Sequence, residues 1–274
     1  MFRARAFASN RAFHPPTDYG REMHFFATDA WSQGVHHYLE HFPQCPKGRA
    51  ADTELAFAVD ATPAYLRKPI VATRLRDVYP SVALPHLRFV VILRDPVERL
   101  HAYWDTFVQA GVGVNDFKKW VDTTLEKVKT CQKAHGPELW PPPDTGRCDP
   151  EVIEGVAAGL YAYQLAYWFK QFTPARFLIT SLDAYERAAG AVLRDVSGFI
   201  GVSAALLGTA REIGTPSDAQ VVKVMGAPPP AAKEALGKFY HPHNAHLHKF
   251  LEGQPHAHCS PNLAGLGIGS WAEG

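Results

Sequence analysis

Short, continuously apolar runs alternate along this chain with longer segments whose apolar residues recur at helical spacing. The runs at 55–59, 89–93 and 177–180 predict strands that are covered on both faces, as in a parallel sheet. Helical patterns occupy residues 31–42, 97–108, 117–128, 152–172, 183–200 and 231–251. Strands that alternate with helices indicate an α/β fold with a central parallel sheet flanked by helices.

The chain is expected to form a single domain, residues 1–274. We see no internal repeat, and the proline-rich breaks at 141–143 and 228–230 are typical of surface loops. A formal charge of +1 at pH 7 gives no sign of a nucleic-acid or membrane-surface partner, so any anion site must be local. No apolar run approaches the roughly 18 residues that a membrane-spanning helix needs.

The stretch RFVVILRDPVERLHAYW, residues 88–104, combines a predicted strand, a turn and the start of a helix. Asp95 is a good helix N-cap, Pro96 suits the first helical position, and Glu98 stands where it can complete a capping box. Arg94 therefore lies where the carboxyl end of a strand faces a helix N-terminus, an arrangement that favours anions. A guanidinium at this place predicts phosphate or sulfate recognition. In the alternative interpretation, Arg94 pairs with Asp95 or Glu98 and only shapes the turn.

This stretch resembles the 3′-phosphate-binding segment of sulfotransferases that use 3′-phosphoadenosine 5′-phosphosulfate (PAPS), most of all the Golgi carbohydrate branch of the heparan sulfate type. Further segments resemble that branch in the same order: REMHFF at 21–26, WSQGVHHYLEHFP at 31–43, AVDATPAYL at 58–66, residues 159–186, VSGFIGV at 196–202 and KFYHPHNAHLHKFL at 238–251. The resemblance covers nearly the whole chain and implies a P-loop-like three-layer fold. It also implies transfer of a sulfuryl group from PAPS to a hydroxyl or amine of a glycosaminoglycan-like carbohydrate, in the Golgi lumen.

The same resemblance assigns the reacting groups. Arg94 would bind the 3′-phosphate of PAPS, and Glu22 would be the general base that takes a proton from the acceptor. Sulfuryl transfer needs little covalent work from a protein, so positioning and charge stabilisation should dominate, by analogy with phosphoryl transfer. Without the resemblance, Glu22 would be interpreted as a solvated charge beside Arg21.

Residues that follow the second predicted strand are candidates for the acceptor site. By resemblance, Asp60 and Thr62 would help to line it, and Tyr65 and Arg67 are weaker candidates. The alternative for Asp60 and Thr62 is turn chemistry, because both residue types favour turns.

Two features depart from the family pattern. The family places a lysine-bearing, Gly/Thr/Ser-rich loop, which cradles the 5′-phosphosulfate, shortly before an HP element, and His14-Pro15 stands at that element here. No such loop is recognisable, so we expect a domain that is N-terminally truncated relative to the family and lacks its first strand. The family serine eight residues after the arginine corresponds to Ala102, which has no hydroxyl. The adjacent His101 shares a helical face with Trp104, where packing is the simpler role.

These departures predict weaker donor binding and slower turnover. Each missing charge-assisted hydrogen bond would remove about 1.5 to 3 kcal/mol. The sequence therefore leaves two functions open: a PAPS-dependent carbohydrate sulfotransferase, and a non-catalytic nucleotide- or glycan-binding relative of the same fold.

The cysteines and histidines add two further hypotheses. Cys131 and Cys148 bracket a Pro- and Gly-rich loop, where a disulfide would restrain the chain and indicate an oxidising compartment; two free thiols are the alternative. A histidine-rich C-terminal part suggests metal binding as a third and weaker function, through the histidines at 241, 243, 246, 248, 256 and 258. No carboxylate or cysteine stands there at a convincing spacing, so we favour a solvated helix face and expect no metal cofactor.

Overall fold

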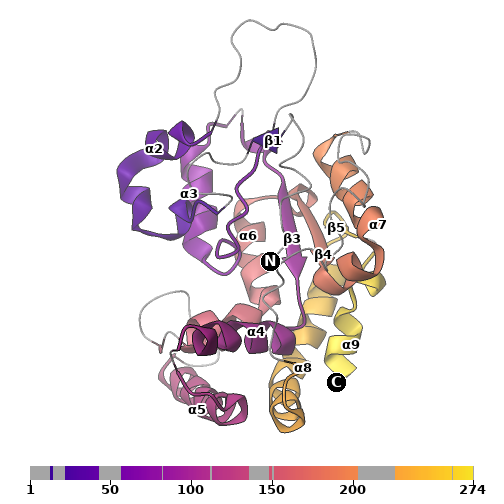
Figure 1. Ribbon diagram of the computed structural model, residues 1–274. Coiled ribbons are helices and arrows are strands. Elements are labelled where there is room, and N and C mark those ends of the chain that lie inside the picture. Colours follow the sequence, from indigo (N-terminus) through magenta and orange to yellow (C-terminus); the bar gives the residue numbers. More distant parts are fainter. Residues whose placement is uncertain are drawn as a thin grey trace, which may run out of the picture.

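A three-stranded parallel sheet forms the centre of the molecule (Figure 1). The computed structural model describes residues 13–14, 22–42, 57–81, 83–111, 113–135, 148–149, 151–202, 226–260 and 262–273. The sheet has the order β3 (Phe89–Leu93), β4 (Phe177–Ser181) and β5 (His258–Cys259), and Phe89 pairs with Phe177 at the start of the register. Two short strands, β1 (Phe13–His14) and β2 (Phe57–Ala58), form a separate parallel pair.

Helices cover both faces of the sheet, as the alternation of side chains along β4 requires. Phe177 and Ile179 belong to a core shared with α3 (Pro69–Val78) and α6 (Tyr161–Gln171). Leu178 points to the other face, where it packs on α7 (Leu182–Ile200) through Ala184, Val192 and Val196. The predicted arrangement of a parallel sheet between helical layers is therefore confirmed.

A second core lies beside the sheet, between helices. It joins α4 (Pro96–Gln109), α5 (Phe117–His135) and the first half of α8 (Pro230–Glu252). The second half of α8 contributes Leu247 and Leu251 to the core under the sheet, so this helix connects the two cores. The remaining helices are α2 (Gly34–Glu40) and α9 (Ile268–Glu273), and the short 3₁₀ turns are Phe25–Ala27, Asp29–Gln33, Leu84–His86, Ala157–Gly159, Pro174–Arg176 and Ala264–Leu266.

Most predicted elements are present within a few residues of their expected bounds. The strand at 89–93 is confirmed as predicted, and the strand at 177–180 is one residue longer. Of the strand expected at 55–59, residues 57–58 form β2, and 55–56 lie outside the described residues. The helix expected at 31–42 is divided into a 3₁₀ turn and α2.

The prediction of one helix over residues 152–172 is wrong. A π-helical turn, Glu151–Val156, and a 3₁₀ turn come first, and α6 begins only after Leu160, whose ψ of 65° is not helical. The carbonyls that this break releases, those of Ala157 and Ala158, accept hydrogen bonds from the side-chain amide of Gln164. The apolar pattern is uninterrupted across the break, so periodicity alone could not reveal it.

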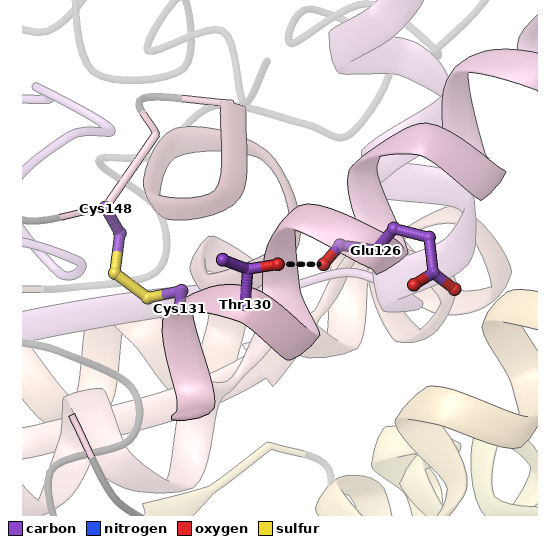
Figure 2. The surroundings of a disulfide bond; sticks show 4 residues. All are labelled: Glu126, Thr130, Cys131 and Cys148. Atoms are coloured by element: carbon purple, nitrogen blue, oxygen red, sulfur yellow. Dashed lines mark hydrogen bonds between the residues drawn. A yellow bond between two sulfur atoms is a disulfide. The ribbon is translucent and has the colours of Figure 1, made fainter. Parts of the chain in front are cut away.

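A disulfide closes the excursion after α5. Figure 2 shows Cys131, on the last turns of α5, bonded to Cys148. The preceding residue, Thr130, donates its hydroxyl to the carbonyl of Glu126, one turn earlier on the helix. Of the two states that the sequence allowed, the structure shows the disulfide, and Cys259 is a free cysteine.

Among the helices that the structure describes, we find none whose length and apolar character would let it cross a bilayer.

Candidate functional site

The turn between β3 and α4 has the predicted N-cap, Asp95, and the predicted first helical residue, Pro96, while the Glu98 side chain faces Arg94. The Asp95 carboxylate accepts from the backbone N–H of Val97 at 2.7 Å and of Glu98 at 3.3 Å, which makes it the N-cap of α4. Burial raises the pKa of this carboxyl, and the two N–H donors act against that rise. Because Pro96 has no N–H and Asp95 occupies the next two donors, an anion bound here would depend on the side chain of Arg94 more than on the helix backbone.

Arg94 is fixed at its backbone and partly exposed at its side chain. Its carbonyl accepts a hydrogen bond of 2.8 Å from the Tyr161 hydroxyl, and burial raises the pKa of that phenol to about 12, so it stays a donor at neutral pH. The guanidinium is 31% exposed and lies 3.8 Å from Glu98. This is the pairing of the alternative interpretation, but an exposed ion pair of this kind contributes only about 0–1 kcal/mol. An anionic ligand can therefore replace Glu98 at little cost.

The position of the family serine offers no hydrogen bond. Ala102 lies on α4, and its neighbour His101 is 2% exposed, stacked on Trp104 and edge-on to Phe117. Burial lowers the pKa of the His101 imidazole, which favours its neutral form. The structure gives His101 a packing role and gives Ala102 only a methyl group.

Glu22 opens a short irregular segment that ends in two buried aromatic residues. Its carboxylate lies 3.3 Å from the imidazole Nε2 of His24 and is 25% exposed. His24 has a φ of 53°, the only positive φ of a non-glycine residue within the described ranges. Phe25 and Phe26 follow directly and are almost fully buried. Glu22 and His24 therefore form a pair at the surface, anchored by the core beneath them.

Asp60 is the centre of a hydrogen-bond network behind Glu22. One carboxylate oxygen accepts from the Met23 N–H at 3.5 Å, the Thr62 N–H at 3.1 Å and the Thr62 hydroxyl at 2.6 Å. The other accepts from the hydroxyls of Tyr65 at 2.6 Å and Tyr38 at 3.3 Å. Burial, together with the nearby Asp60 charge, raises the pKa of both phenols, so both remain protonated donors.

Thr62 and Tyr65 continue this network to the next backbone amides. The Thr62 hydroxyl accepts from the His24 N–H at 3.0 Å, and the Tyr65 hydroxyl accepts from the Phe26 N–H at 3.4 Å. We call Asp60, Thr62 and Tyr65 the amide cradle, because each accepts a hydrogen bond from the backbone of the segment 23–26. Their polar atoms thus have partners inside the protein, and a direct contact with an acceptor stays a prediction.

The basic residues near this segment also have internal partners. Arg67 forms an ion pair with Glu154 of the π-helical turn. Lys68 donates to the carbonyl of Ala27, and Arg74 donates to the carbonyl of Phe26 at 2.8 Å. Lys68 and Arg74 therefore hold the residues that follow Glu22 from the α3 side.

The predicted site residues therefore form two groups. Glu22 lies with the amide cradle, while Arg94 lies at the start of α4. The two groups are connected through the π-helical turn Glu151–Val156. Glu154 of this turn forms the ion pair with Arg67, and the carbonyl of Gly155 accepts a hydrogen bond from Arg99 of α4.

Three contributors were not singled out from the sequence: His24, Tyr38 and Tyr161. His24 and Tyr38 stand within the motifs REMHFF and WSQGVHHYLEHFP, so the motifs were an available signal for both. Tyr161 also lies within a segment that resembles the family, residues 159–186, but its role was not visible there because its partner is a backbone carbonyl 67 residues away.

Two of the C-terminal histidines of α8 contact one aromatic ring, while His241 and His256 are exposed. Tyr163 of α6 stacks on His246 and meets His243 at an angle. Across the described ranges, no three residues among His, Cys, Asp and Glu are grouped so that they could hold a metal ion.

The sequence is weakly similar to carbohydrate sulfotransferases. No protein-family model matches the sequence. Carbohydrate sulfotransferase 15 of Homo sapiens is 26% identical over 178 residues, and the Mus musculus protein of that name is 25% identical over 178 residues. Each match covers 63% of this chain but only 31% of the relative, so the chain spans less than a third of the length of these proteins.

A solved structure of similar fold is also a sulfotransferase. The crystal structure of a sulfotransferase from Alicyclobacillus acidocaldarius superposes with a TM-score of 0.61 at 20% identity, covering 90% of this chain and 89% of that one. At this identity the likeness concerns the fold, and the chain has the α/β fold of a sulfotransferase.

Proposed function

We propose that the chain is a sulfotransferase that moves a sulfuryl group from PAPS to a hydroxyl or amine of a glycosaminoglycan-like carbohydrate. The observation that carries the proposal is Arg94, placed at the carboxyl end of β3 and the start of α4 in a chain with the sulfotransferase fold. The weak similarity to carbohydrate sulfotransferase 15 supports the carbohydrate acceptor. The family resemblance of the motifs supports the heparan sulfate type.

The donor would be held by its 3′-phosphate at Arg94. The guanidinium fits this ligand because it is partly exposed and lies 3.8 Å from its partner Glu98. A phosphate that forms shorter, charge-assisted hydrogen bonds to Arg94 can displace Glu98 from this ion pair. Tyr161 keeps the Arg94 backbone in place while the side chain exchanges partners. Since Ala102 has no hydroxyl, Arg94 carries a larger share of this contact than in the family pattern.

Glu22 would act as the general base on the acceptor side. The acceptor oxygen or nitrogen forms a bond to sulfur, and the bond from sulfur to the bridging oxygen of PAPS breaks. The electron pair of that bond stays on the 5′-phosphate, which leaves 3′-phosphoadenosine 5′-phosphate, while the acceptor proton moves to Glu22. The imidazole of His24, 3.3 Å from the carboxylate, can stabilise its charge before the proton arrives.

The Golgi lumen is the compartment that we propose. The disulfide between Cys131 and Cys148 supports it, because disulfides persist in oxidising compartments. The resemblance to the Golgi carbohydrate branch supports the same location.

The donor site is tested by calorimetry with 3′-phosphoadenosine 5′-phosphate. We expect the unmodified protein to bind it, and Arg94→Ala to weaken binding roughly 10- to 100-fold, which is the loss of one strong charge-assisted contact. Arg88→Ala is the matched control, because Arg88 precedes the opposite end of β3 and should leave the affinity unchanged. Equal, negligible heats for the unmodified protein and Arg94→Ala would reject the donor site.

The base is tested by transfer of labelled sulfate from PAPS to a desulfated glycosaminoglycan. Glu22→Gln is expected to lower kcat roughly 100- to 10,000-fold while the affinity for the donor product is kept. Full activity of Glu22→Gln would reject Glu22 as the base. Nucleotide binding without any transfer by the unmodified protein would instead favour the non-catalytic relative of this fold.

A further inference from the structure

The backbone N–H groups next to Glu22 donate their hydrogen bonds to side chains. Residues 22–24 belong to no helix or strand, so the amides there have no ladder partner. Instead, the N–H groups of Met23, His24 and Phe26 each donate to one side chain of the amide cradle. The cradle residues lie 37, 38 and 39 positions further along the chain, so each link is a tertiary contact.

We propose that Asp60, Thr62 and Tyr65 are positioning residues for Glu22. They bind the backbone immediately after Glu22 and thereby fix the direction in which its carboxylate is presented to an acceptor. This inference rests on the proposed function, in which Glu22 takes the acceptor proton.

The strained backbone at His24 shows why such a hold is needed. A non-glycine residue with a φ of 53° costs of the order of 1–3 kcal/mol and persists only where its surroundings enforce it. Here the Thr62 hydroxyl fixes the amide of that same residue, and Phe25 and Phe26 anchor the chain on its other side. The left-handed turn at His24 accompanies the close approach of its ring to Glu22.

The cradle is itself rigid. Thr62 is 6% exposed, and its hydroxyl bridges the His24 amide and the Asp60 carboxylate. The phenols of Tyr38 and Tyr65 fix the second oxygen of Asp60. A misplacement of about 1 Å can lower a rate roughly 100-fold, so loss of one bridging hydroxyl should be visible in catalysis.

The first experiment removes the Thr62 hydroxyl and restores it. We expect Thr62→Val, which keeps the shape of the side chain, to lower kcat of sulfate transfer roughly 10- to 100-fold with an unchanged KM for PAPS. Thr62→Ser keeps the hydroxyl and should retain most of the activity. The matched control is Thr124→Val, since Thr124 is also buried, on α5, and its hydroxyl donates to the carbonyl of Trp120 within the same helix. Unchanged kcat in Thr62→Val would overturn the proposal.

A double-mutant cycle separates positioning from general stability. If Thr62 acts through Glu22, then Thr62→Val should cause no further loss of kcat in the Glu22→Gln background. An equal loss in both backgrounds would show that Thr62 only stabilises the fold, and would overturn the proposal. Should Thr62→Val fail to fold, Tyr65→Phe provides the same cycle. It removes the acceptor of the Phe26 amide, together with the hydrogen bond from Tyr65 to Asp60, and leaves the acceptors of the Met23 and His24 amides in place.

Amide hydrogen exchange tests the cradle without reference to activity. We expect the amides of Met23, His24 and Phe26 to be protected in the unmodified protein, and the His24 amide to exchange faster in Thr62→Val than in Thr62→Ser. Protected amides in a chain that transfers no sulfate refute the proposed function alone. Unprotected amides in an active chain refute the cradle alone.

Discussion

Arg94 and Glu22 are both held through their backbones. At Arg94 the contact is a phenol bonded to the carbonyl, and at Glu22 it is a set of acceptors bonded to the next amides. In both cases the charged group itself stays partly exposed. A side chain presented in this way can bind a ligand while its place in the chain is kept.

His101 is a residue whose protonation should control stability in mild acid. Burial lowers the pKa of its imidazole, Arg94 acts in the same direction, and Glu98 and Asp105 act against it. The unfolded chain therefore binds a proton more readily than the folded one when the pH falls below the ordinary value of 6.5. The stability that the neutral ring contributes is fully present above this value and is lost as the pH falls toward the lowered pKa.

His101→Phe provides the measurement. The phenyl ring can keep the contacts with Trp104 and Phe117 but cannot titrate. We expect the free energy of unfolding in urea to fall less between about pH 7.5 and about pH 5 in the variant than in the unmodified protein. Identical pH slopes for the two proteins would contradict this assignment.

At the scale of elements, the start of α4 depends on a glycine in another segment. A Cβ added to Gly159 would lie 2.9 Å from the Cβ of Pro96 and 3.0 Å from a ring carbon of Tyr240. Neither atom is the end of a flexible side chain, so the helix start or the buried tyrosine must shift. Such overpacking typically costs about 1–3 kcal/mol.

We therefore expect Gly159→Ala to lower the free energy of unfolding in urea by this amount. It should also weaken binding of 3′-phosphoadenosine 5′-phosphate, because Pro96 lies two residues after Arg94. Gly198→Ala is the control: no atom lies within 4 Å of its added Cβ, and a helical glycine replaced by alanine gains about 0.5–1 kcal/mol. Equal destabilisation by the two substitutions would argue against the steric explanation.

The disulfide after α5 is the second element-scale constraint. It joins residues 17 apart, and closing a loop of this length stabilises a protein by about 3 kcal/mol in the chain-entropy model. We expect Cys148→Ser to lower Tm by roughly 5 to 10 °C. A reducing agent should bring the unmodified protein to the Tm of the variant and leave the variant unchanged; a Tm that does not respond to reductant would count against a structural disulfide.

At the scale of the whole molecule, the sequence predicts what is encoded locally. β3, the Asp95 cap and α4 follow from a buried run and the residues directly after it, and all three are confirmed. The disulfide could be proposed because its two cysteines bracket one loop. The break before α6 was missed because the apolar pattern continues through it, while Gly159 at the break packs closely on Pro96 and Tyr240, which come from distant segments.

The candidate site divides along the same line. Glu22 and Arg94 could be named from motifs, since each motif is a short string. The hydrogen bond from the Met23 N–H to Asp60 could not be predicted, because it joins residues 37 positions apart that are not paired in a strand. The two-residue strand β5 was missed for a similar reason: it is defined by pairing with β4, 80 residues earlier along the chain.

The amide cradle has a consequence for redesign. The cradle accepts hydrogen bonds from main-chain N–H groups, so these contacts do not depend on which side chains the bound segment carries. The residue at position 22 can therefore be exchanged while the loop keeps its shape, and position 24 accepts residues that tolerate its left-handed backbone, such as asparagine or aspartate. Grafting other acids or sugar-binding groups onto these positions offers a route to new acceptors on an unchanged frame.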